Sequence, residues 1–198
     1  MSLIDLITGN VGNQVAEDSS KKFGIDKNQI IALSAVAVPL IVGALRKNAQ
    51  KSAAEADNIN NALSRDHDGS ILNNPTAASQ QDGNSILNHI LGNDRNQVEQ
   101  QLASKTGIGM DKVGPILASL APLIMGYIGK QKAQNNVSSG GGISDLLSGI
   151  LSSTAGNTGT NAGGFDLGSI ASAVLGNQNQ NNSGGGNLLG GLLNNIFK

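Results

Sequence analysis

The chain has 198 residues and a formal net charge of −1, and it contains no cysteine. Only 14% of its residues are charged, against roughly 25% in ordinary soluble proteins, and uncharged Asn, Ser and Gly take their place. Without a basic run the chain has no electrostatic surface for a phosphate backbone, so we exclude nucleic acid as a partner. Without cysteine it has no disulfide, thiolate nucleophile or zinc finger. A surface with so little charge opposes association weakly, which favours a protein that binds itself.

The composition of the two ends of the chain indicates where the folded region lies. Residues 1–10 contain no basic leader and no long apolar core, so we expect no signal peptide and a cytoplasmic protein. Beyond residue 134 only Asp145, Asp166 and Lys198 are charged, and 15 of the 27 glycines lie there. This composition is typical of linkers and predicts a low-complexity tail over 134–198.

An internal repeat with an offset of 83 residues organises the first two-thirds of the chain. Sixteen residues between 2 and 50 recur in register, among them Pro39 and Gly43, which return as Pro122 and Gly126. We therefore predict a helical repeat unit A over 1–50 and a unit B over 84–133. A polar connector with a short helix, over 51–83, is expected between them.

Each unit is predicted to contain three helices, of which the first two are short. The first, over 3–7 or 86–91, ends in Gly-Asn, and Asn10 and Asn93 are expected to cap the second helix. The second helix is expected to end at Gly24 in unit A and at Gly107 in unit B.

The third helix of each unit, over 30–45 and 113–129, contains no charged residue. Asp26 precedes Gln29 by three residues, the spacing of a capping box, and in unit B Asp111 is expected to act as the cap. Lys47 and Lys130 fall in the last turns, where cations oppose the helix dipole.

These two apolar segments raise the question of a membrane span. Sixteen residues reach roughly 24 Å, which is short of a hydrocarbon core of about 30 Å. We interpret them as core helices kinked at Pro39 and Pro122, in which Gly43 and Gly126 allow close contact. A membrane-spanning hairpin is the alternative.

The connector holds the one stretch that resembles a metal site, because Asp66 and Asp68 precede a glycine as in part of a calcium loop. If they are its third and fifth residues, Pro75 falls at the twelfth position, where a bidentate glutamate is required. We interpret the stretch as a polar turn with an Asx-type cap, and metal binding by the two aspartates stays open. His67 and His89 lack a metal-ligand spacing, and His89 is expected on a half-buried helix face.

The tail contains three short segments that keep the apolar period of a helix. Helices this short are marginal in water, so the segments must dock on the chain's own core, on other copies of the chain, or on lipid. Long linkers would let several segments reach other molecules at once, which favours assembly. Their polar faces of Gly, Ser and Asn also resemble helices that sense lipid packing defects. The candidate assembly residues are Leu146, Leu147, Ile150, Leu151, Ile170, Val174, Leu175, Leu188, Leu189, Leu192, Leu193, Ile196 and Phe197.

Three stretches taken together, 66–72 (DHDGSIL), 82–92 (DGNSILNHILG) and 120–126 (LAPLIMG), resemble the YidB-like group of bacterial proteins. The resemblance covers about residues 1–132 and implies a bacterial, all-helical, soluble protein. It supplies no activity, and no catalytic or binding residue follows from it.

The sequence therefore predicts an all-α protein of two related three-helix units with kinked apolar helices, followed by a Gly/Asn-rich tail that carries short amphipathic helices. No nucleophile elbow, phosphate loop or dinucleotide motif occurs, so we expect no enzyme, no cofactor and no metal. The predicted function is structural: a homo-oligomer or filament-like assembly in which tail segments fill apolar grooves on other copies. The alternative is a peripheral membrane-binding module, and a lipid surface or another protein stays open as a partner.

Overall fold

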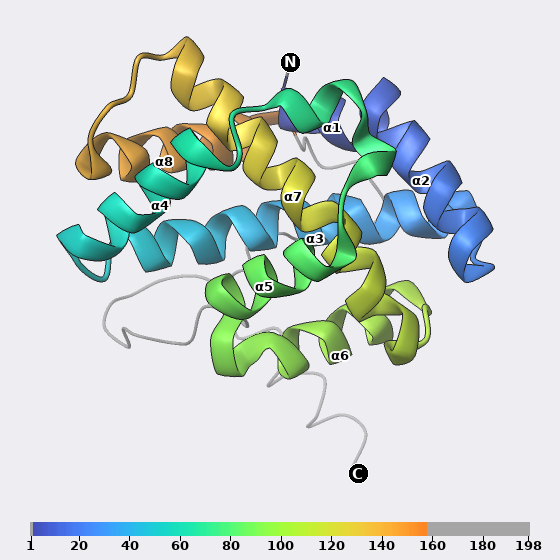
Figure 1. The fold of residues 1–198 in the computed structure, drawn as a ribbon. Helices are drawn as coiled ribbons and strands as arrows, with labels where there is room; N and C mark the ends of the chain where they lie inside the picture. Colours follow the sequence, from blue (N-terminus) through green and yellow to red (C-terminus); the bar gives the residue numbers. More distant parts are fainter. Residues whose placement is uncertain (1, 158–198) are drawn as a thin grey trace, which may run out of the picture.

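The computed structural model describes residues 2–157, and this part of the chain is helical without a strand, which confirms the predicted all-α class (Figure 1). Short 3-10 helices, labelled η, join some of the α-helices. In chain order the elements are α1 (Leu3–Thr8), α2 (Asn10–Phe23), α3 (Lys27–Ala49), α4 (Ala53–Arg65), η1 (Ser70–Asn73), η2 (Pro75–Ala77), α5 (Gln80–Leu91), η3 (Gly92–Asp94), α6 (Arg95–Thr106), α7 (Met110–Gln134) and α8 (Gly140–Asn157).

The helices follow the repeat seen in the sequence. α1, α2 and α3 correspond to α5, α6 and α7, and three pairs of helix boundaries differ by 83 residues: Thr8 and Leu91, Phe23 and Thr106, Lys27 and Met110. A further helix follows the long helix of each unit: α4 lies in the connector, where a short helix was predicted, and α8 overlaps the first predicted tail segment. α8 lies beyond residue 133, in the region expected to be tail.

Glycines end the second helix of each unit, as predicted. Gly24 and Gly107 adopt left-handed conformations, with φ of 66° and 71°, which side chains with a Cβ rarely tolerate. The prediction that Asn10 and Asn93 are N-caps was wrong: Asn10 is the first residue of α2, and Asn93 lies within η3. Gly9 ends α1 and also caps α2, which leaves no separate capping position for an asparagine.

The long helices begin differently in the two units. The carboxylate of Asp26 caps α3, as predicted, and it accepts a hydrogen bond from the backbone N–H of Asn28 at 2.8 Å. The prediction for Asp111 was wrong, because α7 begins at Met110 with Gly109 as its N-cap, and Asp111 falls inside the first turn. α7 therefore begins without a side-chain cap.

α5 begins six residues earlier than the sequence predicted. The hydroxyl of Ser79 accepts a hydrogen bond from the backbone N–H of Asp82, which caps a helix that starts at Gln80. Gly83 lies in this added turn, and a glycine inside a helix lowers its intrinsic stability. The reason for this glycine is its contact with α7, because a Cβ at this position would overlap the backbone carbonyl oxygen of Ala118.

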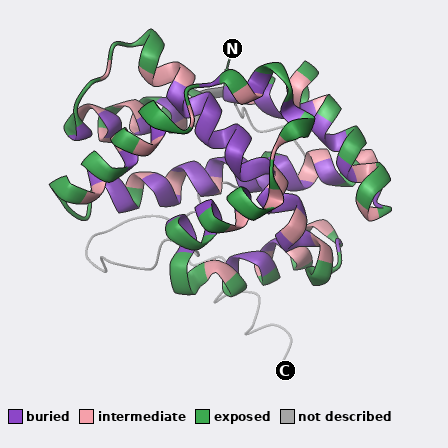
Figure 2. Cartoon of the chain, in the orientation of Figure 1, coloured by how far each residue is buried: buried purple, intermediate pink, exposed green. Residues whose placement is uncertain are grey.

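α3 is the central element and contacts each of the other described α-helices. α3 and α7 are long and apolar enough to cross a membrane, yet 61% and 83% of their most apolar stretches are buried inside the bundle. Figure 2 shows buried residues along both helices and exposed residues on the outer turns of the surrounding ones. This is the arrangement expected of core helices, and Pro39 and Pro122 lie inside them as predicted.

Candidate functional site

The first of the three predicted tail segments is α8, and it lies in a groove between α3 and α4. Ile143 and Leu147 are fully buried there, and Ile150 is nearly so. Gly140 allows the start of α8 to approach the backbone of α4 closely, because a Cβ at this position would lie 2.9 Å from the carbonyl carbon of Ala56. An apolar face on a glycine-flanked segment is thus seated in a groove of the same chain.

Four of the candidate assembly residues lie in α8. Leu147 and Ile150 belong to the core of their own chain, and Leu146 and Leu151 are half-buried against it. Leu147 and Ile150 therefore have almost no apolar surface left for another molecule, whereas Leu146 and Leu151 keep part of theirs. The other candidates lie outside the described residues: Ile170, Val174, Leu175, Leu188, Leu189, Leu192, Leu193, Ile196 and Phe197.

The Asp66–Asp68 turn packs against α7. The carboxylate of Asp68 accepts a hydrogen bond of 2.9 Å from the backbone N–H of Ser70, which confirms the predicted Asx-type cap. This bond holds the pKa of the Asp68 carboxyl below its usual value. In the part of the chain from 2 to 157, no three His, Asp or Glu side chains gather in a group that could hold a metal ion.

Small residues of α7 let this turn come close. A Cβ at Gly129 would overlap the backbone carbonyl oxygen of His67, and one at Gly126 would press on the side chain of Ile71. The predicted role of Gly126 in close contact is therefore confirmed, and its partner is the connector. Gly69 has a φ of 99° and lies over the same stretch of α7, so the turn also depends on a glycine of its own.

A shallow cleft of about 390 Å³ lies between the ends of α3 and α5. Nε2 of His89 is 2.9 Å from Oε1 of Glu55, and the side chain of His89 is 59% exposed, more than the half-buried face predicted for it. The buried Asn48 donates from Nδ2 to the backbone carbonyl of Ile90 at 2.9 Å. This bond ties the last turn of α5 to α3, so we interpret the polar groups around the cleft as a junction between the two units.

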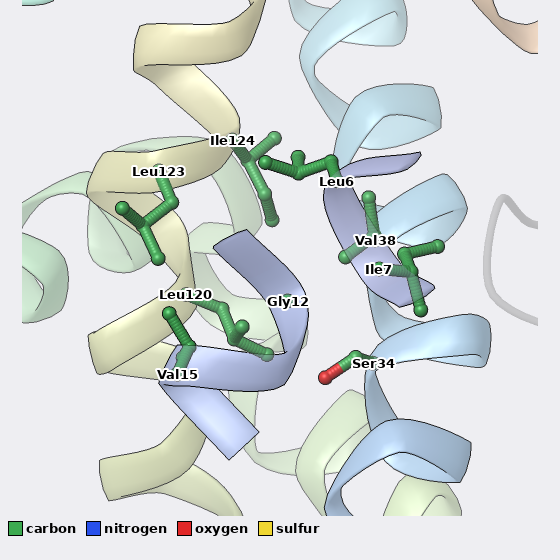
Figure 3. Close-up of a pocket in the computed structure, with 9 residues that line it drawn as sticks. All are labelled: Leu6, Ile7, Gly12, Val15, Ser34, Val38, Leu120, Leu123 and Ile124. Carbon is green, nitrogen blue, oxygen red and sulfur yellow. The ribbon is translucent and has the colours of Figure 1, made fainter. Parts of the chain in front are cut away.

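The core contains a small void between α1, α2, α3 and α7 (Figure 3). Its volume is about 10 Å³, which is close to the minimum needed to hold a single water molecule. Ser34 supplies its polar group, and the Ser34 hydroxyl already donates to the backbone carbonyl of Ile30 at 2.8 Å. The void is too small for a cofactor or substrate.

Sequence reasoning missed a buried network that joins α5 to α6. Nε of Arg95 lies 2.7 Å from Oε1 of Glu99, and the two ends of its guanidinium donate to the side chains of Asn84 and Asn88 at 2.6 Å. Glu99 is 9% exposed and packs beside Gly114 of α7. The i,i+4 spacing of Arg95 and Glu99 was a visible signal, but it is also common on solvated helix faces.

The comparison with known families matches residues 5–131 to the family described as "Bacterial protein of unknown function (DUF937)". The match runs from α1 into α7 and leaves α8 and the tail outside. No curated protein and no solved structure matches the chain. The match agrees with the resemblance to the YidB-like group, which is a bacterial domain of unknown function. Because the match covers more than half of the chain, the protein belongs to this family.

Proposed function

We propose that the protein has a structural, non-enzymatic function and assembles with copies of itself through the last apolar segment, residues 188–197. The observation that carries this proposal is the seating of α8. One of three segments with the same apolar period docks through Ile143, Leu147 and Ile150 in a groove formed by other helices. The last segment has the same period and needs a comparable partner.

The described surface suggests what that partner is. The groove between α3 and α4 is filled by α8, and Met110 is the one large hydrophobic residue that is exposed within the described part of the chain. Apart from the face of α3 around Ala35, the described surface therefore offers little apolar area to a segment of a second molecule. The same segment in other molecules is a better partner, since short amphipathic helices bury their apolar faces by forming bundles with one another.

The sequence around the segment suits such an association. Gly184, Gly185 and Gly186 precede it and form a flexible linker, and Lys198 is the one charged residue beyond them. Because the segment carries almost no charge, neighbouring copies repel each other weakly. The net charge of −1 for the whole chain has the same effect.

Light scattering of the full chain across a concentration range tests the proposal. Leu192→Asp with Leu193→Asp places two charges on the apolar face, and we expect the assembled mass to fall. Asn194→Asp with Asn195→Asp is the matched control, because it adds the same charge to the same segment at polar positions. A mass that is unchanged by the leucine substitutions, or lowered equally by both pairs, would contradict the proposal.

Binding to a lipid surface is the second candidate, and the same segment favours it. Its polar face consists of Gly and Asn, as in weakly charged helices that detect packing defects in lipid bilayers. Flotation of the full chain with liposomes separates the two functions. A monomeric chain that floats, and that stops floating after Leu192→Asp with Leu193→Asp, would replace assembly by membrane binding.

A further inference from the structure

Equivalent faces of the two long helices are covered differently. Ala118 of α7 is fully buried, whereas Ala35, which occupies the same position of α3 in the repeat, is exposed. In α7 the first turns of α5 provide the cover: the Gln80 side chain donates to the carbonyl of Pro115 at 3.3 Å, and Gly83 lies against the carbonyl of Ala118. α1 begins at Leu3, the counterpart of Ile86, so it has no counterpart of these turns in the described structure.

The open face of α3 is apolar. Ile31 and Ala32, which lie beside Ala35 on the helix surface, are half-buried, Ala35 is exposed, and the polar Asn28 two turns earlier is exposed as well. No charged residue occurs in the sequence from 28 to 45. The face therefore suits an apolar helix and offers nothing to an ionic ligand.

The tail contains a segment that resembles the helix covering α7. Residues 164–177 (GFDLGSIASAVLGN) align with residues 80–93 (QQDGNSILNHILGN), and six of the fourteen positions are identical. The identical residues include the Ser-Ile pair and the final Leu-Gly-Asn. One difference affects the fit, because Leu167 stands in the place of Gly83 and the glycine follows one residue later.

The order of the chain brings this segment to the right place. Segment 164–177 follows α8 as α5 follows α4, so the alignment continues the order of the repeat. The far end of α8 lies beside α1 (Figure 1), which packs on α3. Seven residues from Asn157 to Gly164 can span up to about 23 Å, which limits how far from the end of α8 the segment can begin.

We propose that residues 164–177 dock on the open face of α3 around Ala35 in the same molecule. The segment then covers the face of α3 that corresponds to the one α5 covers on α7, without the close backbone contact of Gly83, because Leu167 stands in its place. Ile170 and Val174 correspond to Ile86 and Ile90, which are buried in α5, and they supply the apolar contacts. This docking is separate from the proposed assembly, which uses residues 188–197.

The test uses the full chain with one introduced thiol, since the natural sequence has none. Ala35→Cys reports on the face, and its rate of labelling with a maleimide is measured with and without Ile170→Asp plus Val174→Asp. If the docked state is about ten times more populated than the undocked state, labelling of Ala35→Cys slows by about tenfold. We expect the two aspartates to remove this protection. Gln50→Cys, at the exposed end of α3, is the matched control and should label equally fast in both backgrounds.

Three results would overturn the docking. The first is equal labelling of Ala35→Cys with and without the aspartates. The second is protection that disappears on dilution, which would place the segment of a second copy on α3. The third is protection lost after Leu192→Asp with Leu193→Asp, which would mean that self-assembly, and not residues 164–177, covers the face of α3. Retained protection together with a lowered assembled mass would support both proposals.

Discussion

Gly83 of α5 lies directly against the backbone carbonyl of Ala118 in α7. This carbonyl has no N–H partner within its own helix, because the residue four positions later is Pro122. The proline thus exposes a polar group that needs space, and the glycine supplies the space. The contact explains why α5 keeps a glycine in its interior and why it lies so close to α7.

Gly83→Ala is therefore expected to destabilise the fold, although alanine favours helix. The added Cβ would overlap the carbonyl oxygen of Ala118 and force α5 away from α7, at a cost of about 1–3 kcal/mol. Gly149→Ala is the matched control, since this glycine of α8 has open space around it, and about 0.5–1 kcal/mol of stabilisation is expected there. Urea unfolding shows whether each variant is less or more stable than the natural chain. A Gly83→Ala protein that is more stable would refute the packing argument.

Arg95→Ala is expected to be far more damaging than the loss of a surface ion pair. It leaves Glu99 buried without its charge partner, which costs about 3–5 kcal/mol in unfolding free energy. Lys21→Ala breaks a pair of the same spacing with Glu17 on an exposed face, where water and salt screen the charges and little stability should be lost. Similar losses in the two variants would show that the Arg95 network is not structural.

Acid is expected to destabilise the protein through two capping carboxylates. The pKa of Asp5 is lowered by hydrogen bonds from the backbone N–H and hydroxyl of Ser2, and that of Asp68 by the N–H of Ser70. A carboxylate with a depressed pKa in the folded state contributes stability above its unfolded pKa, and this contribution is lost as pH falls through the folded pKa. The loss should therefore begin near the ordinary value of 3.8 and grow below it.

The midpoint of thermal unfolding, followed from pH 7 to strongly acidic solution, measures this loss. Asp5→Asn with Asp68→Asn should lower the midpoint at neutral pH and flatten its dependence on acid. Curves of equal slope for the variant and the natural chain would mean that other groups control the acid response.

The sequence predicted the parts of the fold that depend on periodicity and on glycine. The two long core helices and the ends at Gly24 and Gly107 follow from local physics, because each depends on residues close together in the chain, and the 83-residue repeat is visible by comparing the sequence with itself. The early start of α5 could not be predicted in this way. The low helix propensity of glycine makes Gly83 an unexpected helix residue. The contact that requires a glycine there is with α7, which is distant in the sequence.

The candidate site was harder to predict, because amphipathic segments look alike whatever they dock on. Leu147 and Ile150 satisfy the pattern of an assembly segment and of a core helix equally well. The choice between them depends on whether a groove is available, and the groove between α3 and α4 forms only in the folded chain. The Arg95 network depends in the same way on Asn84 and Asn88, which a different helix presents.

The central position of α3 joins the two units of this protein more closely than repeats are joined in a linear array. In a linear array each repeat contacts only its neighbours, so units can be lost from an end one at a time. Here α3 of the first unit touches every other described α-helix, and Asn48 binds the last turn of α5 across the two units. Neither copy has a complete interior without the other. We therefore expect the two similar halves to unfold together, as one unit.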